Sequence, residues 1–226
     1  MSYLLRVVLP DHPGSLGAAA TAIGQVGGDI ISLDVVERGP RGAVDDLLVA
    51  LPSGGLPDTL VTAAQSVSGV VVESVRPYAG NADLHHDLEL VDKLASKPTL
   101  GLALLTENAP GVFRAGWALT LELGGDGIRA LHGSAGAPER APTDLPWLPL
   151  PAARRLDWQE EWVPPRWVDV GMELAAAPLG SPFRVILVGR PGGPQFRASE
   201  VLRLAHLAGI TATVTARTDD RPPATV

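Results

Sequence analysis

The residue types best suited to holding a small ligand lie in one short segment near the N-terminus. It reads Leu9-Pro10-Asp11-His12-Pro13-Gly14-Ser15-Leu16. An apolar run precedes it and an amphipathic segment follows, so that Gly14 and Ser15 would open a helix. The first backbone N–H groups of a helix lack intrahelical acceptors and bind carboxylates, while a nearby Asp11 can pair with an ammonium group. A free amino acid carries both groups. The segment therefore predicts an amino acid site, with His12 as a further candidate contact.

The same residues also fit a turn that holds no ligand. Pro13, Gly14 and Ser15 together form a good start for any helix, with Ser15 as the capping residue. A loop histidine such as His12 commonly faces solvent. At the level of sequence, both interpretations stay open.

The predicted order of secondary structure positions this segment after a first strand. Strand patterns occur at residues 3–9, 30–37, 43–51 and 70–75. Helical stripes of apolar residues occur at 16–27 and 56–67, and residues 39–42 form a turn cluster between the second and third strands. The order is therefore β-α-β-β-α-β, the ferredoxin-like arrangement.

In this order, residues 3–77 resemble the ACT domain, a small regulatory module that binds amino acids at paired domain interfaces. The resemblance rests on a D-x-P-G-x-L pattern, which Asp11, Pro13, Gly14 and Leu16 meet. It implies a homodimer, in which the loop after the first strand and the start of the second strand face each other with the ligand between them.

The second part of the resemblance is Gly28-Asp29-Ile30, where the family usually has Gly-x-Asn-Ile. Asp29 departs from the common Asn and adds a second negative charge. That charge is compatible with an ammonium contact and equally with a site that no longer binds. The resemblance implies that Gly28, Asp29 and Ile30 contribute to the ligand site.

A change in composition indicates a second domain. The predicted boundary lies near residues 78–82, which gives a first domain at 1–79, a second at 83–217 and a disordered tail at 218–226. All five tryptophans lie in the second part, at Trp117, Trp147, Trp158, Trp162 and Trp167. Predicted elements there are helices at 83–95 and from 201, and strands at 99–106, 117–123, 127–132, 167–174 and 183–189.

The end of this second part resembles the closing strand and helix of GAF-type sensor domains. The resembling residues are Val185–Arg190, Pro194–Phe196 and Ser199–Leu204, within a match that spans 83–215. The resemblance implies an antiparallel sheet with helices packed at one face. It also implies a helix through residues 209–215, where β-branched residues favour a strand. The predicted fold class of the whole chain is α+β.

No cofactor, metal or catalytic residue is predicted. The chain has no cysteine to attach a bilin, it lacks the Asn-Lys-Phe-Asp-Glu set that accompanies cyclic nucleotides in GAF domains, and an isolated His132 or His206 is more often a surface or core residue than a haem ligand. His85 and His86 are adjacent on a helix and point about 100° apart, so they cannot share a metal.

Three further segments have plain structural interpretations. Glu160 and Glu161 beside Asp157 form a solvated polar stretch. Residues 189–194 are glycine-rich but lack the Lys and Ser or Thr of a phosphate loop, and indicate a turn. Trp158, Trp162 and Trp167 with Pro164 and Pro165 form either a cover over the second domain's sheet or a partner surface, and both alternatives stay open.

Composition narrows the function classes. Eighteen basic against twenty-five acidic residues give a net charge of −7, without a basic block that could neutralise phosphates, which disfavours nucleic acid. Neither a signal peptide nor a membrane-length apolar run is present, which predicts a cytoplasmic protein without membrane partners. We expect a non-catalytic regulatory protein that senses a free amino acid. The alternatives are an ACT-regulated biosynthetic enzyme with a catalytic second domain, and an adaptor that binds another protein.

Overall fold

The structure, a computed structural model, describes residues 1–40, 42–78 and 86–219. The chain forms two compact units, Met1–Leu84 and His85–Val226. Each unit is of mixed α+β type with one antiparallel sheet. Residues 79–82, where the sequence places the domain boundary, lie outside the described ranges.

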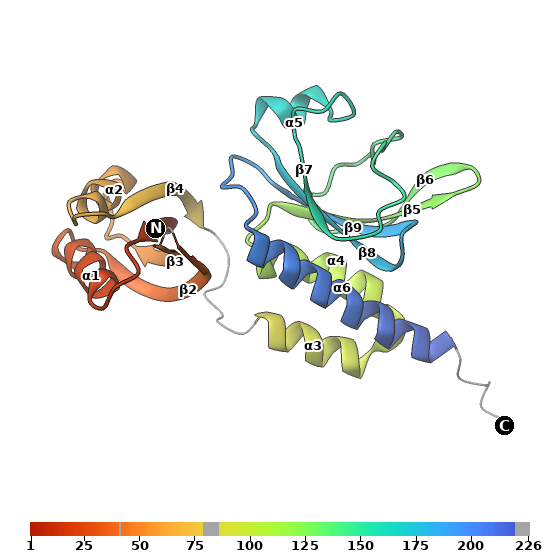
Figure 1. Cartoon of the computed structure of the whole chain (residues 1–226), viewed down its shortest axis with the longest axis horizontal. Coiled ribbons are helices and arrows are strands. Elements are labelled where there is room, and N and C mark those ends of the chain that lie inside the picture. The colour runs from red at the N-terminus through yellow and green to blue at the C-terminus, as the bar shows by residue number, and fades with distance from the viewer. Residues whose placement is uncertain (41, 79–85, 220–226) are drawn as a thin grey trace. The chain divides into compact units, whose positions relative to one another are not determined.

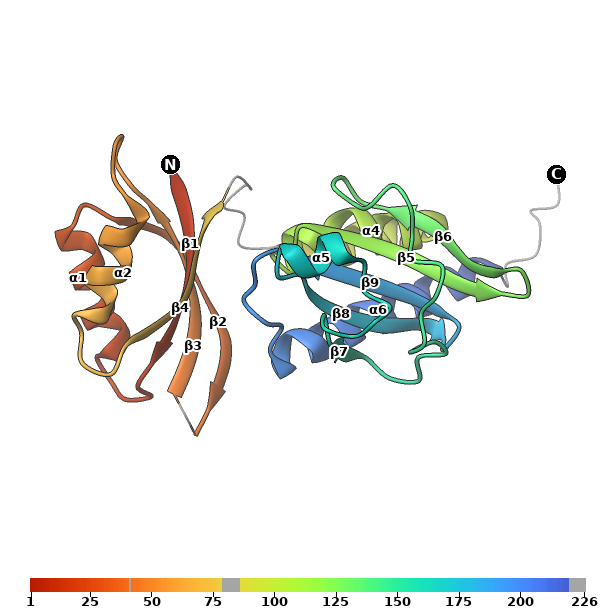
Figure 2. The same cartoon turned by 90° about the horizontal axis from the view of Figure 1, so that it is seen from above.

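The first unit has the predicted β-α-β-β-α-β order. Its elements are β1 (Ser2–Leu9), α1 (Ser15–Gln25), β2 (Asp29–Gly39), β3 (Gly42–Ala50), α2 (Pro57–Gln65) and β4 (Val71–Tyr78). The strand order in the sheet is β2-β3-β1-β4, and every pair is antiparallel. Both helices lie on one face of the sheet (Figure 2).

The core of the first unit lies between this face and the helices. On β1, alternate residues Tyr3, Leu5, Val7 and Leu9 are buried against the helices, as the period of a half-buried strand requires. From α1 the buried contacts are Ala19 and Ile23, four residues apart on one helical face. The apolar periodicity of the sequence is therefore the packing pattern of this core.

The second unit is a five-stranded antiparallel sheet with its three long helices on one face. Its elements are α3 (His86–Ser96), η1 (Pro98–Leu100), α4 (Gly101–Val112), β5 (Trp117–Gly124), β6 (Gly127–Gly133), β7 (Arg154–Leu156), α5 (Pro165–Asp169), β8 (Glu173–Ser181), β9 (Arg184–Arg190) and α6 (Ala198–Asp219). The strand order is β6-β5-β9-β8-β7. Figure 1 shows α3, α4 and α6 on one face of the sheet, and α5 with the long connections around it on the other.

Two apolar clusters pack on the two faces of this sheet. On the helical face, small strand residues such as Ala118, Ala175 and Ala177 let the helices approach closely. The opposite face is filled by Trp117, Trp147 and Trp167 with their aliphatic neighbours. Of the two alternatives for the tryptophan-rich stretch, packing over the sheet is the one that these contacts support.

One predicted strand is wrong. Residues 99–106 begin with the short helix η1 and continue as α4. Their apolar run fits both a strand and a helix, but Leu105, Ala109 and Val112 are all buried at helical spacing. Thr106, a residue that favours strands, donates its hydroxyl to the carbonyl of Leu102 at 2.7 Å, which satisfies its polar group within the helix.

The predicted strand at 167–174 is also wrong, except for its last two residues. Residues 165–169 form α5, which starts with Pro165 in its first turn, and β8 begins only at Glu173. Sequence reasoning also missed β7, because three residues are too short for a periodic pattern. The predicted helix through 209–215 is confirmed, and the hydroxyl of Thr211 donates to the carbonyl of Leu207 at 2.8 Å.

The predicted disordered tail begins too early. Helix α6 extends to Asp219, so residues 218 and 219 are helical. Residues 220–226 lie outside the described ranges.

Candidate functional site

The segment singled out in the sequence is the loop between β1 and α1. Gly14 directly precedes the helix in a left-handed conformation with φ of 94°, which favours glycine. Asp11, His12, Pro13 and Gly14 are exposed.

Ser15 does not cap the helix, contrary to the ligand-free interpretation. It is the first helical residue and is buried, and no side chain among the described residues caps α1. Its hydroxyl oxygen lies 2.9 Å from Nδ1 of His12, so the two side chains hold each other across the turn. His12 therefore shapes the loop as well as facing solvent.

The first turn of α1 leaves two backbone donors available. The amide of Ser15 donates to the carbonyl of His12 at 3.3 Å, and that of Ala18 donates to Gly14 at 2.9 Å. Between them, the amides of Leu16 and Gly17 have no acceptor among the described residues. Two unpaired N–H groups at a helix start can hold a carboxylate.

The two halves of the predicted site lie at opposite ends of the sheet within one chain. Leu9, which leads into the loop, pairs with Ala43, whereas Asp29 pairs with Ala50. The 11 residues of α1 separate the two ends, a length of about 16 Å. A single copy therefore does not bring Asp29 to the loop.

The apolar members of the predicted site pack inward. Leu16 and Ile30 are partly buried against the core of the first unit. Gly28 is required by packing, because a Cβ there would lie 2.6 Å from Cγ2 of Ile23. These three residues support the site's backbone, which leaves Asp11, His12 and Asp29 as exposed polar groups.

Sequence reasoning missed a buried carboxyl group near this loop. Asp45 lies on β3 opposite Val7, two positions along β1 from Leu9, and is 3% exposed. Its Oδ1 atom has no hydrogen-bond partner among the described residues. Burial raises the pKa of Asp45, Arg38 opposes that rise, and the charge of Asp46 adds to it. The available signal was a pair of aspartates inside an otherwise apolar strand.

Asp46 differs from its neighbour because it is fully paired. On the other face of the sheet, Nε and Nη2 of Arg6 donate to its two carboxylate oxygens at 2.7 and 2.8 Å. Both side chains are almost completely buried. A bidentate pair of this kind fixes strand position and carries no open binding capacity.

The other candidates from the sequence lie on the surface. His132 and His206 are exposed, as are Glu160 and Glu161, and Glu160 accepts a hydrogen bond from the Trp162 indole at 2.8 Å. His85 and the side chain of His86 lie outside the part of the chain that the structure describes. Within the described ranges, no three His, Asp or Glu side chains are arranged to hold a metal ion.

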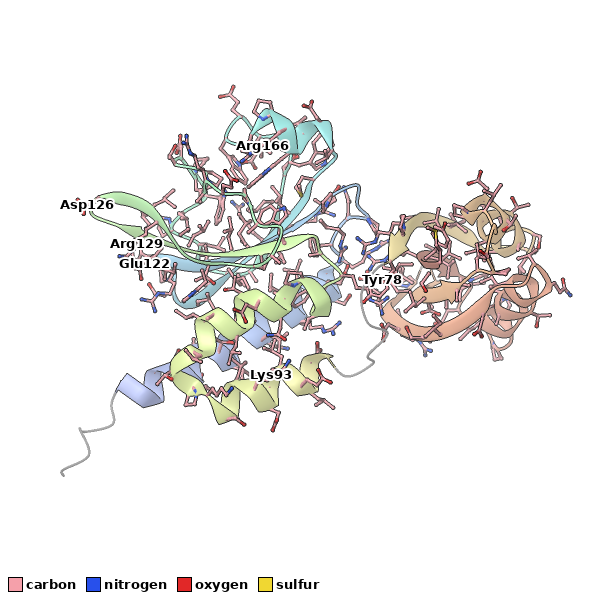
Figure 3. All side chains as sticks on the ribbon, turned by 180° about the vertical axis from the view of Figure 1, so that it is seen from behind. Tyr78, Lys93, Glu122, Asp126, Arg129 and Arg166 are labelled. Carbon is pink, nitrogen blue, oxygen red and sulfur yellow. The ribbon has the colours of Figure 1, made fainter. Side chains whose placement is uncertain are left out.

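A cluster of charged side chains on the β5–β6 hairpin also lies on the surface. Figure 3 shows Glu122 and Arg129 side by side on neighbouring strands, with Asp126 at the tip. Glu122 accepts from Arg129 at 2.8 Å and from Arg184 at 2.6 Å. Hydrogen bonds from Arg184 first, and then from Arg129, lower the pKa of Glu122. Both arginines therefore share the one carboxylate of Glu122 at an exposed hairpin, and these contacts hold neighbouring strands together.

Comparisons with known proteins give structural neighbours only. No protein-family model and no curated protein matches the chain. Among solved structures, a GAF domain/HD domain protein from Geobacter sulfurreducens is 15% identical, with 57% of this chain and 94% of that chain covered at a TM-score of 0.40.

Two further neighbours are GAF domains. The GAF domain of a sensor histidine kinase from Pseudomonas syringae pv. tomato is 14% identical over 60% of this chain and 86% of that chain, at a TM-score of 0.43. The GAF domain from an Acinetobacter phosphoenolpyruvate-protein phosphotransferase is 9% identical over 61% and 97%, at a TM-score of 0.38. At these values, the chain's own residues remain the basis for any functional assignment.

None of the helices in the described ranges combines the length and apolar composition needed to cross a membrane.

Proposed function

We propose that the chain is a non-catalytic regulatory protein whose first unit is an ACT-type, ferredoxin-like module that binds a free amino acid. The observation that carries this proposal is the start of α1, where the amides of Leu16 and Gly17 are unpaired behind a left-handed Gly14. They would bind the ligand's carboxylate, and the exposed Asp11 in the same loop would pair with its ammonium group.

A homodimer would complete the proposed site. Strand β2 is an edge of the sheet, and Ile31 and Val35 on it are 41% and 48% exposed. If two β2 edges pair antiparallel, the start of one strand lies beside the end of the other. That end of the sheet is where the loop at Asp11 emerges, so the partner's Asp29 would approach it. The proposal thereby accounts for a site whose halves lie apart in one copy.

For the second unit we propose a GAF-like regulatory domain that receives or transmits the signal. Support comes from the sequence pattern around β9 and α6, together with an antiparallel sheet that carries its helices on one face. Amino acid binding would order the loop and shift an equilibrium between two states of the protein, by no more than the ligand's difference in affinity for them.

Thermal unfolding of the full chain against each of the twenty amino acids tests this proposal. A ligand at about 100 times its Kd adds about 2.7 kcal/mol to stability, a shift of several degrees. Asp11→Ala should abolish the shift. Asp58→Ala is the matched control, because Asp58 is also exposed and also lies at a helix start.

Each outcome of this experiment is informative. A selective shift that Asp11→Ala abolishes and Asp58→Ala retains supports the site, and a ligand-dependent change in size by sedimentation supports the dimer. Twenty unchanged transitions would refute amino acid sensing and favour the adaptor. Chemical conversion of the bound amino acid would favour the enzyme.

A further inference from the structure

A second candidate site lies wholly within the second unit. A cavity of about 660 Å³ lies between two segments. One is residues 152–155, which lead into and include part of β7, and the other is residues 196–205, which include the first turns of α6. Its volume lies within the range of small-molecule sites in proteins. Sequence reasoning did not find it, because the GAF-like pattern over residues 194–204 gives no sign that this segment lies beside residues 152–155.

The cavity is lined almost entirely by apolar side chains. Four of them are alanines, at Ala152, Ala153, Ala198 and Ala205, and their small size leaves the space open. On the rim, Leu202 is 57% exposed, a large apolar surface for a single residue. Such a lining favours an apolar ligand body.

The floor of the cavity is held rigidly. Phe196 lines it and is only 2% exposed. The guanidinium of Arg190 stacks on the Phe196 ring, 4.0 Å from its centroid, and pairs with Glu200 at 2.6 Å. Because Phe196 is fixed in this way, the cavity exists before a ligand arrives, which favours binding.

Among the described residues of the lining, Arg155 is the charged one. It is exposed, and its Nη1 atom donates to Oε1 of Gln195 at 2.7 Å. In the described part of the chain, no carboxylate forms an ion pair with it. Burial raises the pKa of Glu173, and the nearby charge of Arg155 partly opposes that rise. The two side chains do not form an ion pair. The guanidinium is therefore available to an incoming anion.

The length of the cavity limits the ligand. Along α6 the lining extends from Ala198 to Ala205, about 10 Å at the rise of an α-helix. This length accommodates one small molecule and is too short for a partner helix of several turns.

We infer that this cavity binds a small monocarboxylate with an apolar body about 10 Å long, whose carboxylate pairs with Arg155 and whose body covers Phe196 and Leu202. The planar guanidinium can hold a carboxylate through two parallel hydrogen bonds. The site would give the second unit a ligand of its own, independent of the amino acid proposed for the first.

Calorimetric titration of the full chain with octanoate tests this inference. Arg155→Gln should weaken octanoate binding at least about tenfold, because it removes a charge-assisted contact. Arg154→Gln is the matched control, since it makes the same charge change one residue away, outside the lining, and should leave binding unchanged. Octylamine, with the same chain and the opposite charge, should not bind.

A second variant tests the apolar part. Ala205→Leu fills the cavity from α6 and should also abolish octanoate binding, with folding checked by circular dichroism. The inference is overturned if octanoate does not bind the unaltered chain, if Arg154→Gln and Arg155→Gln weaken it equally, or if octylamine binds as well. Because the probe differs from the twenty amino acids, failure here is distinguishable from failure of the proposed amino acid site.

Discussion

Two ion-paired glutamates of the second unit should respond very differently to the same substitution. Oε1 of Glu200 accepts from Nη2 of Arg190 at 2.6 Å, and its Oε2 accepts from the amide of Arg197 at 2.8 Å. Arg190 is fully buried and also donates to the carbonyls of Phe113 and Pro194. Glu200→Gln removes the charge that compensates this buried guanidinium.

The burial of the Arg190–Glu200 pair determines how much free energy of unfolding Glu200→Gln should remove. Removing one partner of a buried ion pair costs about 3–5 kcal/mol, because the other charge stays buried without compensation. The two backbone carbonyls and the Phe196 ring still contact Arg190. We therefore expect about 3 kcal/mol, the lower end, for Glu200→Gln.

The matched control is Glu122→Gln on the β5–β6 hairpin. Glu122 also accepts from two arginines, Arg129 and Arg184, but their side chains are 71% and 41% exposed. Exposed pairs are worth about 0.2–1 kcal/mol because water solvates and screens both charges. The same chemical change should therefore cost no more than about 1 kcal/mol here.

Tryptophan fluorescence during urea unfolding measures this difference. All five tryptophans belong to the second unit, so their signal reports that unit's unfolding. The loss of free energy is read from the shift in midpoint at unchanged m-value. Equal losses for Glu200→Gln and Glu122→Gln would refute the argument that burial decides the cost.

Three further predictions concern the first unit. Burial raises the pKa of Asp45, so the ionised side chain opposes folding, and the stability it contributes is lost as pH rises through the folded-state pKa. Asp45→Asn should therefore be more stable than the original chain at pH 7 by calorimetry. A gain that does not shrink as the pH falls towards the ordinary pKa of an aspartate would contradict this reasoning. Gly28→Ala should lower the free energy of unfolding by about 1–3 kcal/mol, because the new Cβ meets Ile23. Gly24→Ala on α1, which has open space around it, should instead raise that free energy by about 0.5–1 kcal/mol. Similar effects of the two substitutions in chemical denaturation would exclude the proposed clash. Gly14→Ala should cost about 1–2 kcal/mol through its left-handed backbone alone, since no atom lies near the new methyl group, and an unchanged midpoint would show that the loop relaxes.

Sequence periodicity predicted the elements of the first unit well. Alternation along β1 and the four-residue spacing in α1 are local properties of the chain, and the buried faces follow them. Periodicity failed at residues 99–106, where a short apolar run fits both the strand period and the helix period. The helix forms because its apolar side chains are buried together with those of the other long helices on one face of the sheet. It also missed β7, whose three residues are strand only because β8 pairs with them.

The candidate sites divide in the same way. The loop from Asp11 to Leu16 was predictable because a turn and a helix start are determined by adjacent residues. The separation of Asp29 from that loop was not predictable from the residues themselves, because it depends on which strand ends the sheet register brings together. The cavity beside Arg155 joins residues 152–155 to residues 196–205, two segments that meet only in the folded second unit.

Local composition therefore determined the α+β character, the two parts of the chain and the position of the N-terminal loop, since each depends on neighbours along the sequence. Tertiary structure alone decided which charges are buried and which side chains meet. Arg6 and Asp46 are 40 positions apart, and Arg190 reaches the Phe113 carbonyl across 77. The physical reason is that desolvation and contact depend on distance in space, and only folding brings such distant residues within hydrogen-bonding range.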